Sequence, residues 1–430
     1  MSRKIRNTTL GFYLPSFIRM HVGTYTSLAN LNTLDDETAE ATYIHEFTHF
    51  IQDVTTTFGF FNTYVIGEYM RMANNSIIAH PLGPFTLPVE PIPAGPDNVD
   101  VNLTLSRFLS GSGEDDVVTL VRHRLRPEQV ITNNTPLNID VVEIEYTDVN
   151  GITKFFDFGE LCVSESMAYI IERECYPTCP HSPEIPYLAA EKLVDLIYQP
   201  FSQNQLNILA LCDLSLMQQN PGKFFYETLI QFQVNTITFN TPEEVYNWCY
   251  NLPNFDKGLN HFAQLAQQHL TTYLNGEIFN EINDWLQNML TNALNYRLQN
   301  PTFVLDIARG GRLKENTAFK IFFRNVGSPL VTNTNGETTL FNPNSTSALN
   351  YSIILALDQI NSIFWGIKYN CDLVGICSAR WHNIVNLSNN SKPKVDMRCA
   401  TEPWLRSEDK KLCPLAIVWY NWGLTGYYPE

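Results

Sequence analysis

The amino-acid sequence predicts an α+β protein that is mainly helical, with a small β-sheet and a helical C-terminal region. Over most of the chain beyond residue 185, apolar residues recur at three- and four-residue steps, the spacing that one face of a helix requires. Strand-like alternation and turn signals are confined to short segments, of which residues 139–158 are the clearest. A hydrophobic content of 44% and a charged content of 17% are typical of an ordinary folded chain.

The 430 residues are long enough for more than one domain. We place a boundary near residue 185, where mixed helix and strand signals give way to mainly helical ones. Residues 1–185 then form the first unit, and residues 186–430 form a mainly helical C-terminal region.

Charge and composition exclude several classes of partner. A net charge of −16 argues against nucleic acids and anionic membranes, since both require a basic surface. The densest basic run, residues 122–126, is expected to be the solvated face of a strand. Residues 1–20 lack the apolar run of a signal peptide, and no stretch approaches the roughly 20 apolar residues of a membrane span. The odd total of nine cysteines favours reduced thiols. We therefore expect a soluble, cytoplasmic protein with no nucleic-acid or membrane partner. Export without an N-terminal signal is also compatible with the sequence. No pattern in the sequence specifies the oligomeric state.

The first elements come from the N-terminal part of the chain. Short apolar runs within residues 5–28 predict one or two strands. A helix is predicted over about 35–58, because apolar residues follow helical steps there. These residues are Ile44, Phe47, Ile51, Val54 and Phe58. Thr33 or Asp35 is expected to cap the start of this helix, and Gly59 is expected to end it.

Residues 60–79 continue with helical spacing. Six prolines between residues 81 and 96 exclude helix and central strand, and so predict an extended loop. Residues 117–121 have the composition of a strand. Residues 139–158 predict a β-hairpin around an Asn-Gly turn, and a further helix is expected at about 160–174.

Successive helices are predicted in the C-terminal region. They are expected at residues 187–199, 204–219, 222–234, 242–250, 256–298 and 346–368. A second hairpin is expected at residues 330–341, and the aromatic end at 412–428 is expected to pack as core or as an edge strand.

Residues 45–49, inside the first long helix, read His-Glu-Phe-Thr-His. Residues four apart lie on one face of a helix, so His45 and His49 can bind one metal ion. Glu46 lies about 100° further round the helix, within reach of a water molecule on that ion. The pattern points to a zinc site that activates water for hydrolysis. The alternative is a surface helix with two solvated histidines, and the apolar stripe beside them argues against it.

A catalytic zinc site requires a third protein ligand, with the fourth position open. Glu165 is the leading candidate, because the small Ala168 on the same helix face allows close approach to the histidine helix. Glu160 and Glu172 compete for this role. Residues 165–172 read Glu-Ser-Met-Ala-Tyr-Ile-Ile-Glu. With the His-Glu-x-x-His helix, this second helix resembles those of the gluzincins, zinc metallopeptidases whose third ligand is a glutamate on a downstream helix.

The resemblance implies a zincin-like catalytic core within residues 1–185, with a large insertion at about 80–158 between the two site helices. It also implies the chemistry, which is hydrolysis of a peptide or protein bond by a zinc-activated water with Glu46 as general base. The cofactor is then Zn²⁺, and its ligands are His45, His49 and Glu165.

Further roles follow from what such a site needs. Asp53 and Glu172 are candidates to orient a ligand histidine through its second ring nitrogen. The donor to the tetrahedral oxyanion is sought among Tyr169, His123 and His181. The hairpin at 139–158 directly precedes the ligand helix, so it is a candidate for the edge strand that pairs with an extended substrate.

Two other functions are compatible with the same residues. One is a zinc hydrolase of a non-peptide amide, and the other is a catalytically silent, partner-binding protein on a zincin-like fold. The intact Glu46 argues against the silent protein, since a binding protein gains nothing from a base beside the metal.

Two cysteine groups are weak candidates for a second metal site. Cys175, Cys179 and His181 lack a second ligand pair nearby, and the prolines among them are typical of a loop that ends a helix. The late cysteines have irregular spacing that matches no common zinc motif; they are Cys371, Cys377, Cys399 and Cys413.

Overall fold

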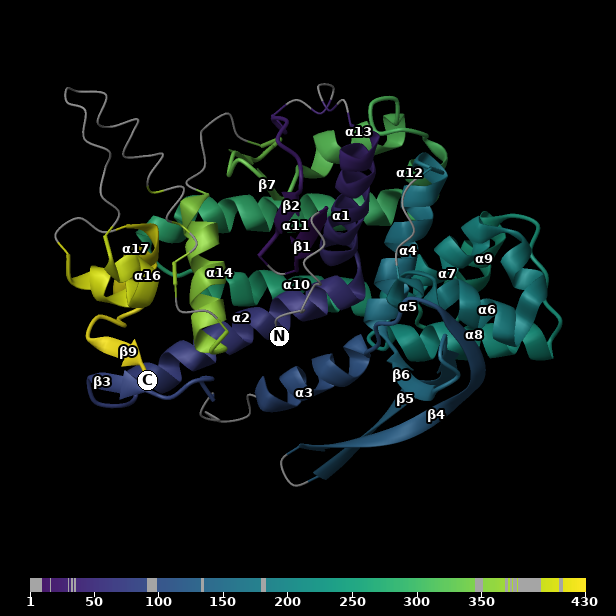
Figure 1. Cartoon of the computed structure of the whole chain (residues 1–430), viewed down its shortest axis with the longest axis horizontal. Coiled ribbons are helices and arrows are strands. Elements are labelled where there is room, and N and C mark those ends of the chain that lie inside the picture. Colours follow the sequence, from purple (N-terminus) through teal and green to yellow (C-terminus); the bar gives the residue numbers. More distant parts are fainter. Residues whose placement is uncertain are drawn as a thin grey trace.

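The computed structural model describes residues 10–15, 17–29, 31, 34, 36–90, 99–132, 135–178, 183–344, 351–367, 370, 371, 373, 377, 396–409 and 413–430. Helices make up most of this structure, and its strands form three small sheets (Figure 1). The prediction of a mainly helical α+β protein is therefore confirmed. None of the helices in these ranges combines the length and the apolar character that crossing a membrane requires.

Helix α1 (Glu37–Thr55) packs against α2 (Thr57–Ile78), α4 (Glu160–Cys175) and α11 (Asn280–Gln299). All of its residues from Ala39 to Thr55 are buried, so the polar face of the helix is enclosed together with the apolar stripe. Its N-cap is Asp36, whose carboxylate accepts a hydrogen bond from the N–H of Thr38; the expected caps, Thr33 and Asp35, were wrong. Because buried polar groups need partners inside the protein, the polar face of α1 is where a site is expected.

The junction between α1 and α2 also differs from the prediction. Helix α1 ends at Thr55, and Thr56 caps α2 by accepting a hydrogen bond from the N–H of Gly59 at 3.1 Å. Gly59 therefore lies in the first turn of α2 and does not end α1. A Cβ atom at Gly59 would lie 2.2 Å from the carbonyl oxygen of Asp53, so glycine is needed for close approach of the two helices.

A four-stranded sheet joins the N-terminal strands to a hairpin far along the chain. Its strand order is β1 (Gly11–Leu14), β2 (Arg19–Val22), β7 (Leu330–Asn333) and β8 (Thr338–Thr339). Strands β2 and β7 are parallel, whereas the two outer pairs are antiparallel. Strand β1 is an end strand of this sheet and packs against α1. The N-terminal strands and the hairpin at 330–341 were both predicted, and their parallel pairing joins segments from either side of residue 185.

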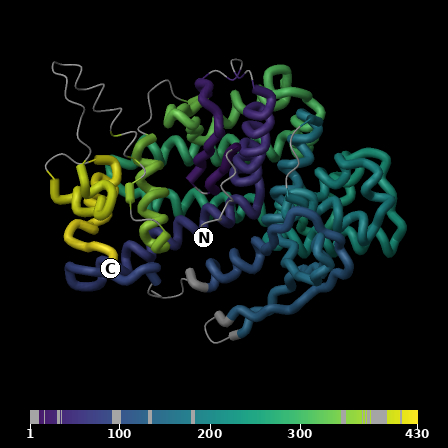
Figure 2. The backbone as a smooth tube through the Cα atoms, in the orientation of Figure 1, coloured from purple at the N-terminus to yellow at the C-terminus, as the bar shows by residue number. Residues whose placement is uncertain are grey.

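The second sheet is antiparallel and consists of β4 (Val118–Thr132), β5 (Thr135–Asp148) and β6 (Thr153–Phe158). Figure 2 shows β4 and β5 as a long hairpin that extends away from the helices. The predicted hairpin at 139–158 is confirmed as β5–β6, and Gly151 in its turn has a φ of 76°. The basic run lies on β4, where Arg124 is exposed and pairs with Glu143.

The remaining helices surround α1 and α4 or extend beyond them. They are α3 (Val99–Ser110), α5 (Glu184–Tyr187), α6 (Ala189–Tyr198), α7 (Gln205–Leu216), α8 (Pro221–Val234), α9 (Pro242–Tyr250), α10 (Lys257–Tyr273), α12 (Phe303–Arg309), α13 (Thr317–Val326), α14 (Ser352–Phe364), α16 (Arg398–Thr401) and α17 (Pro414–Asn421).

Several of these helices correct the prediction. The single helix expected at 256–298 is two helices, α10 and α11, separated by a turn in which Gly276 has a φ of 127°. The aromatic C-terminal end forms helix α17 as well as a short strand, β9 (Tyr427–Pro429), which pairs with β3 (Gly83–Phe85) in the proline-rich segment. Residues 91–98 of that segment lie outside the described ranges.

Candidate metal centre

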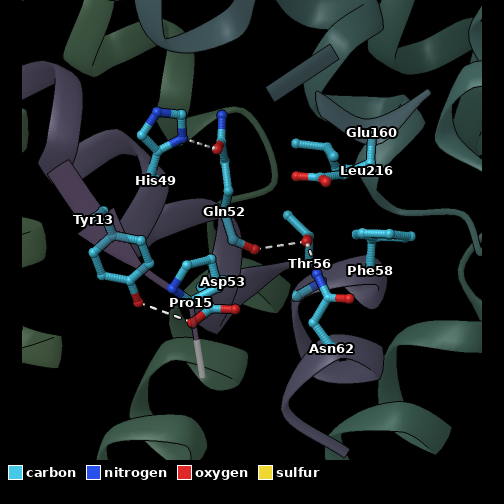
Figure 3. A pocket seen from close by; sticks show the side chains of 11 residues that line it. Tyr13, Pro15, His49, Gln52, Asp53, Thr56, Phe58, Asn62, Glu160 and Leu216 are labelled. Atoms are coloured by element: carbon cyan, nitrogen blue, oxygen red, sulfur yellow. Dashed lines mark hydrogen bonds between the residues drawn. The ribbon is translucent and has the colours of Figure 1, made fainter. Parts of the chain in front are cut away.

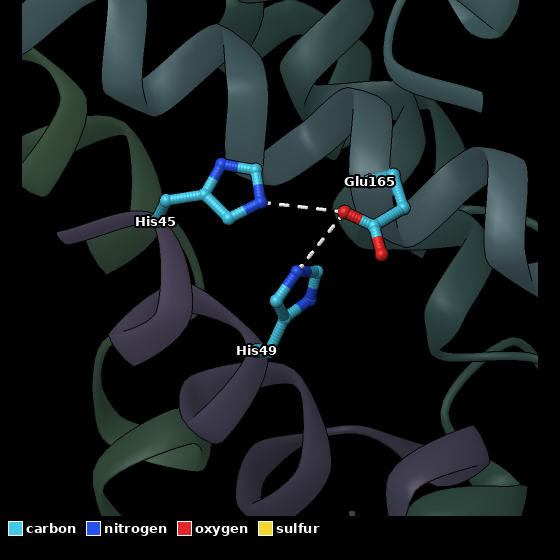
Figure 4. A group of neighbouring side chains, drawn as sticks. All are labelled: His45, His49 and Glu165. Atoms are coloured by element: carbon cyan, nitrogen blue, oxygen red, sulfur yellow. Dashed lines mark hydrogen bonds and ion pairs between the residues drawn. The ribbon is translucent and has the colours of Figure 1, made fainter. Parts of the chain in front are cut away.

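The structure brings three of the residues singled out from the sequence to one point. Nε2 of His45 lies 3.3 Å from Oε2 of Glu165, and Nε2 of His49 lies 3.2 Å from the same oxygen (Figure 4). These donor atoms all lie within 4.8 Å of one another. The histidines come from α1 and the glutamate from α4, and the two helices pack directly against each other. Such a group can hold a metal ion.

Glu172, one of the competing ligands, lies on the other side of His45. Its Oε2 is 2.8 Å from Nδ1 of His45, the ring nitrogen that faces away from the three converging donor atoms. Glu165 and Glu172 are two turns apart on α4, so one helix supplies a carboxylate to each nitrogen of the same imidazole. A carboxylate at Nδ1 favours the tautomer in which Nδ1–H donates and the lone pair of Nε2 is available to a metal.

The second nitrogen of His49 has an amide partner that was not anticipated. Nδ1 of His49 lies 2.8 Å from Oε1 of Gln52, and Nε2 of Gln52 donates to the carbonyl oxygen of Ser164 at 2.9 Å. Gln52 therefore ties the histidine helix to the residue next to Glu165. Asp53, which was expected to orient a ligand histidine, accepts a hydrogen bond from the hydroxyl of Tyr13 at 2.9 Å.

A pocket adjoins His49 on the side of Gln52 (Figure 3). Asp53 and Glu160, both buried, are the carboxylates in its wall. The other lining residues are Tyr13, Pro15, Gln52, Thr56, Phe58, Gly59, Asn62 and Leu216. Glu160 thus faces a pocket beside His49, whereas Glu165 lies at the point where both histidines converge.

Glu46 lies on the side of α1 that faces strand β1. Its side chain is buried, and a Cβ atom at Gly11 would lie 3.1 Å from Cγ of Glu46 and 2.5 Å from Cγ2 of Thr42. Burial raises the pKa of Glu46, although the neighbouring His45 and His49 act in the opposite direction. The absence of a side chain at Gly11 therefore provides the space in which the Glu46 carboxyl lies beside the two histidines.

The charges at the centre depend on each other. Burial alone would lower the pKa of His45, but its hydrogen bonds to Glu165 and Glu172 raise it above the usual value. Burial alone would raise the pKa of Glu165, but His49 and His45 lower it below the usual range. Without a metal ion, a protonated imidazole beside the carboxylate neutralises the negative charge of this buried site. A divalent cation at the same point would take the place of the imidazolium proton.

The other predicted residues have different surroundings. Tyr169 is buried, and the guanidinium of Arg173 lies 4.6 Å from its ring centroid. His123 lies on β4 of the second sheet, where its Nδ1 is 3.0 Å from the hydroxyl of Tyr226. His181 and Cys179 lie outside the described residues. The aromatic ring beside His45 belongs to Tyr187 of α5, with centroids 5.7 Å apart, and no sequence signal distinguished this tyrosine from the others.

No protein-family model, curated protein or solved structure matches this chain. The resemblance to gluzincins therefore stays a prediction from the residues of α1 and α4.

Proposed function

We propose that the protein is a zinc-dependent metallopeptidase. One observation carries this proposal, namely the convergence of Nε2 of His45, Nε2 of His49 and a carboxylate oxygen of Glu165, with Glu46 adjacent in the sequence. Two imidazoles and one carboxylate are the protein ligands of one class of catalytic zinc site. The zincin-like core and the gluzincin type remain part of the proposal.

The side chains present fit a zinc ion. Imidazole suits Zn²⁺, and a site with three protein ligands leaves one position for substrate or water. Both histidines have a second partner at Nδ1, Glu172 in one case and Gln52 in the other, as metal-binding histidines generally do. When bound, zinc would supply a Lewis acid that polarises the scissile carbonyl and makes water a stronger acid.

The protein's own groups then perform the proton transfers. Glu46 would take a proton from the attacking water on one of its carboxylate oxygens and pass that proton to the leaving amine. Burial, which raises the pKa of Glu46, makes it a stronger base than an exposed glutamate. Glu172 and Gln52 would keep the two imidazoles in one orientation through their contacts at Nδ1.

An extended peptide would bind beside these groups along strand β1. Strand β1 is the end strand of the four-stranded sheet, and its Gly11 packs against Glu46. A substrate backbone that pairs with β1 would therefore lie next to the general base. This position replaces the one expected at 139–158, because the N–H of Ser112 donates to the carbonyl of Asp157 at 2.9 Å and covers that part of β6. Pairing along a strand favours a peptide over a non-peptide amide, which lacks repeated backbone groups.

The test is the replacement of Glu46 by Gln. We expect Glu46→Gln to keep its zinc, because Glu46 is not one of the three converging groups, and to lose about 10²–10⁴-fold in turnover of a peptide library read by mass spectrometry. Glu40→Gln is the matched control, since Glu40 is also a buried carboxylate on α1 and accepts a hydrogen bond from Tyr176. Zinc-loaded wild type that cleaves no peptide, or a Glu46→Gln variant as active as wild type, would contradict the proposal.

A further inference from the structure

The fold gathers four cysteines that are scattered over the last part of the sequence. The backbone N–H of Cys371 donates to the carbonyl of Cys399 at 2.7 Å, and that of Cys377 donates to the carbonyl of Leu373 at 2.8 Å. Cys413 is the N-cap of α17, which packs on the segment 403–408 directly after Cys399 and α16 (Figure 1). These backbone contacts bring the segments that carry the four cysteines together, and burial raises the pKa of the Cys371 thiol.

N–H groups face three of the four sulfur atoms. The backbone N–H of Leu373 points to the sulfur of Cys371, and those of Leu415 and Ala416 point to the sulfur of Cys413. Nη1 of Arg406 lies 3.4 Å from the sulfur of Cys399. Donors directed at sulfur stabilise a thiolate, the form of cysteine that binds metals.

Cys175 shows the opposite arrangement. Its sulfur is 3.8 Å from the carbonyl oxygens of Ile307 and Ala308, so it donates as a thiol. It is buried in α4, and both of these partners in the described chain are acceptors. Burial of cysteine is thus common in the described chain, and the C-terminal segment adds N–H groups that face three of its four thiols.

A network of charged side chains holds the donor to Cys399 in place. Nε of Arg406 donates to Asp409 at 2.7 Å, and Arg398 bridges Asp409 and Asp396 with contacts of 3.0 and 2.7 Å. These residues lie between Cys399 and Cys413 or just before Cys399. These ion pairs fix the backbone that carries Cys399 and Cys413. A metal site needs such supporting residues to hold its ligands in position.

We propose that Cys371, Cys377, Cys399 and Cys413 bind one structural zinc ion. Four thiolates satisfy the tetrahedral preference of zinc and leave no open position, so the ion would stabilise the fold and take no part in hydrolysis. Among the described residues, only the His45 group has three donor atoms within 4.8 Å of one another, so zinc binding would draw the four sulfurs closer together. The irregular spacing concealed this site, because Cys371 reaches Cys399 through a backbone hydrogen bond and Cys413 comes near through the packing of α17 on residues 403–408.

The test counts zinc in the full chain and in two variants. We expect wild type to bind one zinc ion more than Cys399→Ser, and Cys175→Ser to bind as much as wild type. Cobalt substitution should give wild type a thiolate-to-cobalt charge-transfer absorption that Cys399→Ser lacks, whereas a site of two histidines and one glutamate gives no such band. Equal zinc in wild type and Cys399→Ser, or wild-type mass two hydrogens lower owing to a disulfide between these cysteines, would overturn the proposal.

A second measurement covers a Cys399→Ser variant that fails to fold. A mercurial reagent that modifies thiols should release one zinc ion from wild type, because the histidine–glutamate centre contains no thiol to modify. Zinc released by the mercurial from Glu165→Ala as well would show that the cysteine site is independent of the proposed peptidase centre. No zinc released from the wild type would overturn the cysteine site and leave the peptidase proposal intact.

Discussion

The contact between Glu172 and His45 gives a quantitative prediction about metal affinity. Oε2 of Glu172 lies 2.8 Å from Nδ1 of His45, and the two side chains are only 13% and 8% exposed. Water can therefore replace this carboxylate only partly after it is removed. Loss of such an orienting partner typically weakens metal binding 10–100-fold, which is about 1.4–2.7 kcal/mol. We expect Glu172→Gln, which keeps an uncharged acceptor, near the lower value and Glu172→Ala near the upper one.

The assay is competition for zinc with a chromophoric chelator, in wild type and the two Glu172 variants. Glu174→Gln is the matched control, because Glu174 lies on the same helix with its side chain exposed. The folded state of each variant is checked by circular dichroism. Zinc affinity that stays within twofold of wild type in Glu172→Ala would refute the argument that this carboxylate orients His45.

Three further predictions concern the centre and the packing around it. Because its hydrogen bonds raise the pKa of His45 in the metal-free protein, His45 keeps a proton at pH values above the usual range, and zinc must displace it. Zinc binding should therefore release protons and weaken as pH falls; calorimetry in buffers of different ionisation enthalpy that detects no proton release near neutral pH would contradict this. Gly11→Ala should keep its zinc but turn over peptide more slowly, because its methyl group would lie 2.5 Å from Cγ2 of Thr42 and 3.1 Å from Cγ of Glu46. Unchanged turnover would contradict this and show that β1 can move away from Glu46. Arg297→Met should lower the free energy of unfolding in urea by about 3–5 kcal/mol, because it leaves Asp213 buried without the guanidinium that donates to both of its carboxylate oxygens at 2.7 Å. Adding Asp213→Asn should recover much of this loss. Equal stability of Arg297→Met and wild type would contradict the prediction.

The local elements of the site could be predicted because their signals are local. The apolar spacing from Ile44 to Val54 specified the histidine helix, and the Asn-Gly turn specified the hairpin before α4. Glu165 could be proposed because helical periodicity separates it from Glu160 on the surface of α4.

The partners that support the site could not be predicted, because they depend on which segments meet in the folded chain. Tyr13, Tyr187 and Gln52 are ordinary residues in the sequence, and each gains its position from the packing of α1 against β1, α5 or α4. Gly59 was misread for the same reason, since glycine commonly ends a helix but Gly59 lies in the first turn of α2 and is in contact with the carbonyl of Asp53. The four late cysteines were dismissed on spacing, which measures distance along the chain and not in space.

The metal content of Glu165→Ala shows whether His45, His49 and Glu165 bind one ion together. We expect this variant to bind one zinc ion fewer than wild type, whereas Glu160→Ala, from the same helix and facing the neighbouring pocket, should bind as much as wild type. Equal zinc in Glu165→Ala and wild type after both are saturated with zinc would contradict the proposed centre, because His45 and His49 would then hold the ion without the carboxylate that converges on them.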